Sequence, residues 1–359
     1  MWPAREGDAL WLRWGDAAAP QQALIDMGVA ATGRALKAHI AQLPEAQRRF
    51  ALLVITHVDR DHIAGVLSAL DAPPDGLRFD DIWFNGWPHI QGAARANRLE
   101  DYGPVQGHEL QALLQGRPWN AAFDGGAVAR APGQPPPRVQ LPGGLEICVL
   151  GPTPQRLRDF EPHWREAVEE AIAAARLPDD ALGADGGGLE SYGAVAPPVL
   201  RDRADLERLA DSDDGSDHSE ANGSSICLLL RYQQHALLLC GDAFAADVLD
   251  GVAALPAGEA AGLAAVKLPH HGSAKNVSRE LIAGLDTRRW LISTDGNRFG
   301  HPDDAAIARI LLHSPGPPEL LFNMQSRHNQ YWQDGGWQAR FGYSTHYGQA
   351  PQGYTLMLD

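Results

Sequence analysis

The most constraining feature of this sequence is a short polar segment that follows a continuous apolar run. The run, Ala51–Ile55, is typical of a strand covered on both faces. The segment Thr56–His62 must therefore leave a buried strand as a loop. Because α/β proteins place ligand sites where strands end, we expect a site at this point of the chain.

Four side chains of this segment can donate to a metal ion: His57, Asp59, Asp61 and His62. Imidazole nitrogens and carboxylate oxygens hold zinc and, with more oxygen ligands, manganese or iron. Alternate positions of an extended loop project to one side, so His57 and Asp59 are expected to face one ion and Asp61 and His62 a second. The alternative is a polar loop of capping and hydrogen-bonding residues, which the preceding buried strand disfavours.

Three later apolar segments, each with the character of a strand, also end in potential ligands. Asp242 follows Ala236–Leu239, His270 and His271 follow Ala264–Leu268, and His301 follows Trp290–Thr294. Helical segments and short turns alternate with these strands, which predicts an α/β fold built in layers.

The ordered set resembles the His-x-Asp-x-Asp-His signature of the metallo-β-lactamase superfamily. More narrowly, the sequence resembles the ComEC-like hydrolase domains of DNA-uptake proteins and stand-alone bacterial forms. The features that carry this resemblance are aspartate in place of the usual second histidine and the segments Leu237–Asp242, Lys267–Ser273 and Gly300–Pro302. The resemblance runs with gaps from Asp26 to about Leu312. It implies an αββα sandwich of the metallo-β-lactamase type, with two packed mixed sheets flanked by helices.

By this resemblance, several residues take roles at the site. Asp242 matches a carboxylate that bridges two metals, and Asp26 matches an aspartate that supports the site from behind the ligands. A turn-forming role before Gly28 explains Asp26 equally well on spacing alone. One of His270 and His271 should complete the ligands of the second metal, and the sequence leaves both open.

Other positions are less sharply defined. Ser273 offers a hydroxyl group to substrate, and Asn297 is a candidate substrate contact. His301 is open as a ligand, a proton donor or a residue that stabilises the fold. The third histidine of the wider superfamily has no clear counterpart; His89 and His108 are candidates, although neither follows an evident strand.

The resemblance implies a hydrolase in which a metal-bound hydroxide attacks phosphorus or a carbonyl carbon, with Asp61 or His301 handling the proton. One or two divalent ions are expected, with zinc favoured and manganese possible. A phosphodiesterase or nuclease acting on nucleotides or single-stranded nucleic acid is the first expectation. The alternatives are a hydrolase of small esters, lactones or lactams, and a non-catalytic protein that binds a partner.

The charge balance narrows the substrate. With 30 basic and 45 acidic side chains, the chain carries a net charge of -15 and repels polyanions at long range. Bound divalent metals reverse the sign locally, so nucleic acid is not excluded. Short or single-stranded substrates therefore fit better than long duplex DNA.

We expect a single domain over residues 1–359, with a partly flexible insertion at residues 153–225. Its acidic run, residues 211–220, is interpreted as a solvated loop, with a cation site or partner-binding loop as the alternative. Cys148, Cys227 and Cys240 lie in apolar runs and are expected to be buried free thiols. No apolar run approaches the roughly 20 residues of a membrane span, so a cytoplasmic location is expected. The oligomeric state is left open.

Overall fold

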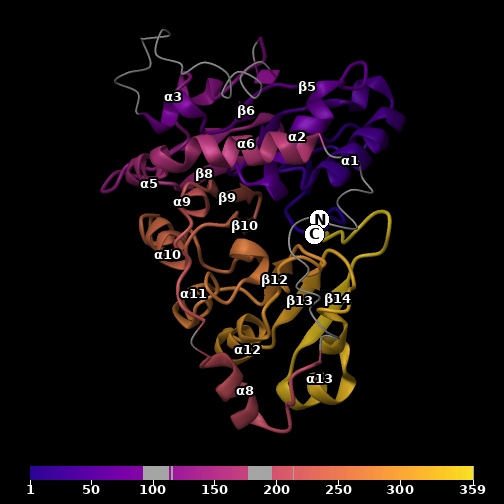
Figure 1. The fold of residues 1–359 in the computed structure, drawn as a ribbon, viewed down its shortest axis with the longest axis vertical. Helices are drawn as coiled ribbons and strands as arrows, with labels where there is room; N and C mark the ends of the chain where they lie inside the picture. Colours follow the sequence, from indigo (N-terminus) through magenta and orange to yellow (C-terminus); the bar gives the residue numbers. More distant parts are fainter. Residues whose placement is uncertain (92–112, 115, 177–195, 213, 359) are drawn as a thin grey trace.

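The protein is described here by a computed structural model that covers residues 1–91, 113–114, 116–176, 196–212 and 214–358. Two β-sheets pack against each other, and helices cover the outer face of each sheet. Figure 1 shows one group of helices at the top of the molecule and a second group at the bottom. The mixed α/β fold expected from the sequence is confirmed.

The smaller sheet has four strands in the order β1-β2-β4-β6. Their bounds are β1 (Leu10–Trp14), β2 (Gln21–Ile25), β4 (Leu52–Val54) and β6 (Ile82–Trp83). Strands β1 and β2 are antiparallel, and the other pairs are parallel. A separate short pair, β3 (Arg49–Phe50) and β5 (Arg78–Phe79), lies beyond this sheet. The outer face packs on α1 (Ala30–Gln42), α2 (Arg60–Asp71) and α6 (Trp164–Ala175).

The larger sheet has eight strands in the order β14-β13-β12-β11-β10-β9-β8-β7. Their bounds are β7 (Arg138–Gln140), β8 (Glu146–Gly151), β9 (Cys227–Tyr232), β10 (His235–Leu239), β11 (Ala265–Lys267), β12 (Arg289–Ile292), β13 (Glu319–Phe322) and β14 (Ser344–Tyr347). Neighbours are antiparallel from β7 to β10 and parallel from β10 to β14. This arrangement places the ends of β10, β11 and β12 at one edge.

Helices cover the outer face of the larger sheet. They are α8 (Arg203–Ala210), α10 (Ala245–Ala253), α11 (Arg279–Gly284), α12 (Asp304–His313) and α13 (Gly335–Phe341). Shorter helices complete the connections: α3 (Trp87–Ile90), α5 (Pro154–Phe160) and α9 (Glu220–Gly223). No helix in the described part of the chain is long and apolar enough to cross a membrane.

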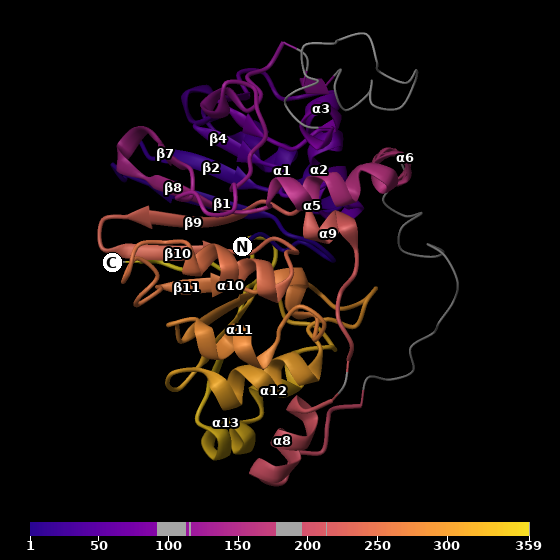
Figure 2. The same ribbon diagram turned by 90° about the vertical axis from the view of Figure 1, so that its left-hand side faces the viewer.

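Alternating side chains of β9 contribute to two different hydrophobic cores. Leu228 and Leu230 of β9 face the smaller sheet, where they pack with Ile25 and Trp83. Leu229, between them, joins the core formed with the helices of the larger sheet. Because successive side chains of a strand point to opposite faces, one apolar strand serves both layers. Figure 2 shows β1, β9 and β10 lying between the two groups of helices.

Local sequence explains where α1 ends and where α2 begins. Helix α1 ends at Gln42, because Pro44 disfavours a helical conformation of Leu43, which is extended. Helix α2 begins at Arg60, within the segment expected to be a loop, with Asp59 at its N-cap position. Asp61 and His62 therefore belong to the first helical turn and not to an extended loop.

Much of the segment 153–225 is packed against the rest of the protein. Phe160, Trp164 and Val168 join the core between the smaller sheet and its covering helices, where α6 contacts α2. Helix α8 contacts α12 on the other side of the molecule. Residues 177–195 lie outside the described residues. Cys148, Cys227 and Cys240 are buried free thiols, as expected.

Candidate metal centre

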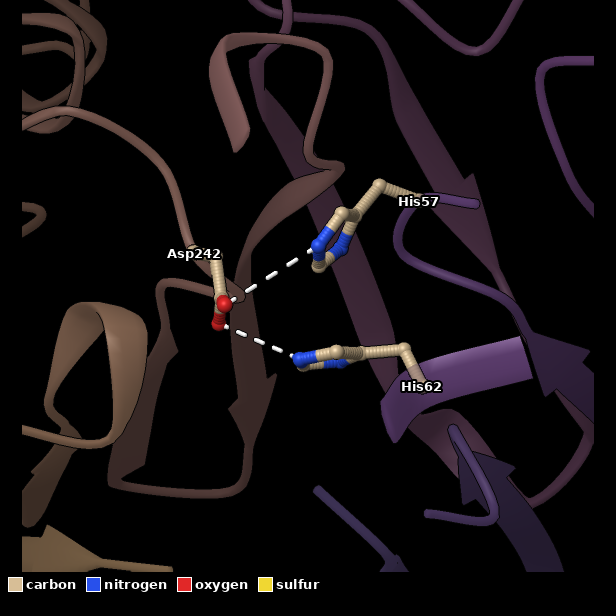
Figure 3. Close-up of side chains that lie close together, drawn as sticks. All are labelled: His57, His62 and Asp242. Atoms are coloured by element: carbon tan, nitrogen blue, oxygen red, sulfur yellow. Dashed lines mark ion pairs between the residues drawn. The ribbon is translucent and has the colours of Figure 1, made fainter. Parts of the chain in front are cut away.

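The candidate ligands meet where strands of both sheets end. His57 follows β4 of the smaller sheet, and His62 lies in the first turn of α2. Asp242 follows β10, and His271 follows β11, in the larger sheet. Figure 3 shows the carboxylate of Asp242 facing the rings of His57 and His62, which come from the opposite side. The centre therefore joins the two sheets.

Asp242 occupies the middle of the cluster. One of its oxygens, Oδ1, lies 3.3 Å from His62 Nε2, and the other, Oδ2, lies 3.9 Å from His57 Nε2 and 3.4 Å from His271 Nε2. The Nε2 atoms of His62 and His271 are 3.2 Å apart. All three imidazoles thus turn the same nitrogen toward one carboxylate.

The remaining carboxylates stand on either side of this group. Asp59 Oδ2 is 3.6 Å from His57 Nε2, and Asp61 Oδ2 is 3.4 Å from His271 Nε2. His62 belongs both to the group with His57 and Asp242 and to the group with Asp61 and His271. The expected division, with His62 confined to the second ion, is therefore too simple. The helical start of α2 turns the ring of His62 toward both groups.

The donor geometry fits a divalent cation. Tetrahedral zinc with ligand distances of about 2.1 Å places its ligand atoms roughly 3.4 Å from one another. In the group of His57, His62 and Asp242, the carboxylate oxygens lie 3.3 Å from His62 Nε2 and 3.9 Å from His57 Nε2, and one ligand atom of each residue lies within 4.8 Å of the other two. His57 Nε2 and Asp242 Oδ1 are buried and have no hydrogen-bond partner among the described residues. Because such orphaned groups are costly, a cation accounts for them better than a purely structural role.

The protonation of the histidines leads to the same conclusion. Burial lowers the pKa of His62, but the carboxylates of Asp242 and Asp26 outweigh burial and raise that pKa well above its usual range. The same balance applies to His271. Burial lowers its pKa, but Asp242 and other carboxylates outweigh burial and raise that pKa well above its usual range. Burial raises the pKa of Asp242, and the neighbouring imidazoles reverse the effect. Without a cation the carboxylates favour protonated imidazoles, and a bound metal would compete with these protons.

Asp26 supports His62 from behind, as expected. Its carboxylate accepts hydrogen bonds from the Thr56 backbone N–H at 2.8 Å and the Thr56 hydroxyl at 2.7 Å. The Oδ2 atom also lies 2.7 Å from His62 Nδ1. The Nδ1–H of His62 therefore points to Asp26, which leaves Nε2 to face the centre.

The two adjacent histidines have different places. His271 is buried in the centre, whereas the side chain of His270 is 24% exposed and its Nε2 lies 4.0 Å from Asp242 Oδ2. Both have a positive φ, and their ring planes are inclined by 78°. The structure thus assigns the central position to His271 and the rim to His270.

His270 is held by a residue of the acidic run. Asn276 Oδ1 lies 2.9 Å from His270 Nδ1, and the Asn276 amide donates to Asp217 Oδ2 at 2.9 Å. Asp217 also accepts from the amide of Asn222 at 2.7 Å. The interpretation of the run as wholly solvated was therefore wrong at Asp217. Ser219 as the N-cap of α9 was the local signal that this stretch is structured.

The other candidates lie at the rim or away from the centre. The ring of His301 is 5.3 Å from that of His270, and its Nδ1 is 3.2 Å from Asp303 Oδ1. Ser273 is buried, and its backbone N–H donates to the His270 carbonyl. Asn297 is exposed and donates to the Asp295 carboxylate, so its hydrogen bonds stabilise its own loop.

His89, one of the two candidates for the third histidine, does not join the cluster. His89 Nδ1 accepts the Gly86 N–H at 3.0 Å, and its Nε2 lies 3.1 Å from the Gly125 carbonyl. Both nitrogens therefore serve loop structure. His108 lies outside the described residues. His271 instead provides the third imidazole.

Two functional neighbours were missed from the sequence: Asp8 and Lys267. Asp8 is buried and forms a potential ligand group with Asp242 and His271. Lys267 is fully buried at the end of β11. A lysine inside an apolar strand was the available signal, because a buried ammonium group requires a partner.

Comparison with known proteins yields no relative from which to transfer a function. Neither a scan against models of protein families nor a search of the curated proteins finds a match. The chemistry of the centre is therefore argued from three imidazoles, the carboxylates around them and the strand ends that bring them together.

Proposed function

We propose that this protein is a metal-dependent hydrolase of the metallo-β-lactamase fold that cleaves phosphodiester bonds in nucleotides or single-stranded nucleic acid. One observation carries the proposal: the two donor groups, His57-His62-Asp242 and Asp61-His62-His271, share a residue and lie side by side. Such an arrangement accommodates one or two divalent ions, with zinc favoured by the imidazoles and manganese permitted by the carboxylates.

The layered architecture supports the fold type. Helices, two packed sheets and further helices follow one another, and the cluster lies where strands of both sheets end. The order of the ligands along the chain is that of the superfamily signature described above. Architecture, motif order and convergence of the ligands are thus mutually consistent.

A bound divalent cation supplies two effects, a lowered pKa of water and stabilisation of negative charge on substrate oxygen. The protein's own residues would do the rest. His57, His62, His271, Asp61 and Asp242 would hold the ions. Asp61 or His301 would take or return the proton, Asp61 beside the centre and His301 at its rim.

The rim favours an anionic substrate. Burial lowers the pKa of His270, but Asp242 and Asp217 outweigh this effect and raise that pKa above its ordinary value. A protonated imidazole at His270, with His301 beside it, would attract a phosphate oxygen. The net charge of -15 argues for short or single-stranded substrates over long duplex DNA.

The test is a hydrolysis screen on metal-stripped protein with added zinc or manganese. It compares bis-p-nitrophenyl phosphate and a single-stranded oligonucleotide with a lactone and a β-lactam. The parent protein should cleave the phosphodiesters, His57→Ala should not, and the exposed His346→Ala serves as the matched control. Cleavage of only the lactone or lactam would transfer the proposal to small-molecule hydrolysis.

Metal content separates an enzyme from a non-catalytic member of the fold. Elemental analysis of the purified protein should find at least about one equivalent of metal that His57→Ala loses. Protein that neither retains nor binds zinc or manganese would contradict the proposed function directly.

A further inference from the structure

A buried ion pair lies directly behind His271. The Nζ atom of Lys267 is 2.6 Å from Asp8 Oδ2, and the side chains are 0% and 2% exposed. Lys267 also donates to the Leu268 carbonyl at 2.9 Å. The pair joins the N-terminal segment to β11, next to the centre, and its lysine engages one oxygen of Asp8 while the other oxygen faces His271.

Stability alone is a poor explanation for this pair. Removing two charges from water costs several kcal/mol per ion, and a well-packed apolar pair is often equally stable or more so. Lys267 lies in a buried and otherwise apolar strand, because Ala265 and Val266 precede it in β11 and are both buried. A buried pair in such a strand is better explained by what it does for its neighbours.

The free oxygen of Asp8 faces His271. Asp8 Oδ1 lies 3.4 Å from His271 Nδ1 as an ion-pair neighbour and accepts no hydrogen bond from the described residues. The Ser293 carbonyl lies 3.0 Å from the same nitrogen. Two acceptors therefore surround Nδ1 and favour a proton on this nitrogen. Nε2 faces Asp61 and Asp242 and is the nitrogen at which a metal would replace a proton.

The N-terminal segment is held firmly enough to act in this way. A Cβ atom on Gly7 would lie only 1.5 Å from the Asp61 carbonyl oxygen, so the segment passes in close contact with the start of α2. The Gly7 carbonyl accepts the Ser293 hydroxyl at 2.9 Å. Asp8 is thus anchored between the start of α2 and the end of β12.

We propose that Asp8, fixed by Lys267, is a positioning residue that holds His271 in the Nδ1–H tautomer with Nε2 directed at the metal. The inference rests on the proposed function only in requiring that the centre binds a metal. Partners that orient a ligating histidine in this way typically contribute about 10- to 100-fold to metal affinity.

The decisive variant neutralises both members of the pair. Asp8→Asn alone would leave a buried ammonium group unpaired, so loss of folding would confuse the result. The double variant Asp8→Asn/Lys267→Met removes both charges and keeps similar volumes. The matched control is Arg130→Met/Asp250→Asn, which removes another ion pair with a buried cation that contacts none of the candidate ligands.

The measurement is the Kd for Zn²⁺ by chelator competition, with urea unfolding of the metal-free proteins alongside. The double variant should fold and bind Zn²⁺ about 10- to 100-fold more weakly than the parent, while the control retains the parent affinity. A folded double variant with the parent's affinity would overturn this inference alone. A parent protein that binds no Zn²⁺ would overturn the proposed function and the inference with it.

A second measurement needs no substitution. Two-dimensional ¹H–¹⁵N NMR of histidine side chains reports which ring nitrogen carries the proton. In the Zn²⁺-loaded parent protein, His271 should keep its proton on Nδ1. A proton on Nε2 of His271, with Nδ1 free, would overturn the inference even if the double variant failed to fold.

Discussion

At the scale of single residues, Asp242 is the carboxylate on which the centre depends. Its oxygens lie within 4.0 Å of the Nε2 atoms of His57, His62, His270 and His271. No other carboxylate among the described residues is this close to all four rings. The burial of Asp242 means that water cannot replace it when it is lost. A change that keeps its volume and removes only its charge isolates this role.

Asp242→Asn should therefore lower zinc affinity and phosphodiester hydrolysis by more than about 100-fold, since even residues behind a ligand contribute about 10- to 100-fold. Asp80→Asn, at a carboxylate paired with Arg49 on the surface, is the matched control and should leave both quantities unchanged. Retention of full metal affinity in Asp242→Asn would show that Asp242 is not a ligand.

Asp304 supports a pH prediction at the same scale. Burial raises its pKa from 3.8 to about 6, although the Tyr331 hydroxyl, at 2.6 Å, opposes the rise. The folded protein holds this proton more tightly than the unfolded chain. The contribution of Asp304 to the free energy of unfolding is therefore full below about pH 4 and disappears as pH rises through about 6. The difference between the pKa of Asp304 in the folded and unfolded states corresponds to at most about 3 kcal/mol.

Asp304→Asn should remove that loss, because the amide keeps an oxygen acceptor for Tyr331 but does not ionise. Urea unfolding should show the variant gaining stability relative to the parent as pH rises from about 4 to about 7. A constant difference between the two proteins across this range would contradict the assignment of the proton to Asp304.

At the scale of elements, close contact between α1 and α2 sets the position of the motif. A Cβ on Gly65 would lie 2.0 Å from the Met27 carbonyl oxygen, and one on Gly33 would lie 2.1 Å from the Gly65 carbonyl oxygen. The two helices therefore approach as closely as backbone allows. Since α2 begins with the ligands, this contact also fixes their distance from β2.

Gly65→Ala should accordingly destabilise the protein by about 1–3 kcal/mol, although alanine is the better helix former. The control is Gly335→Ala in α13, where a Cβ would meet nothing within 4 Å and the effect should be neutral or slightly stabilising. The comparison is made by urea denaturation. Equal effects of the two substitutions would show that α1 and α2 can separate at little cost.

At the scale of the whole molecule, the centre links the two sheets, since His57 and His62 belong to the smaller sheet's half and Asp242 and His271 to the larger sheet's half. The two halves are also tied by the N-terminal residue: the Met1 amino group donates to the Tyr354 carbonyl at 2.7 Å. A cation held by both halves should stabilise the protein as a whole.

Zinc at about 1,000 times its Kd should stabilise the fold by about 4 kcal/mol, and chelation should reverse the gain. Binding should release protons, because the raised pKa values of His62 and His271 keep these rings charged without metal. Calorimetry in buffers of different ionisation enthalpy measures that release. Asp242→Asn should lose both effects, and zinc binding without proton release would contradict the protonation described here.

The amino-acid sequence was enough to locate the apolar strands that end in candidate ligands, because the spacing of apolar residues and the residue types able to bind a metal are local properties. The run Ala51–Ile55 predicted β4, and residue type and spacing alone marked residues 56–62 and Asp242 as donors. The choice between His270 and His271, and the pairing of Asp8 with Lys267, came only from the three-dimensional fold. These outcomes depend on contacts between distant segments, whose partners no local pattern encodes.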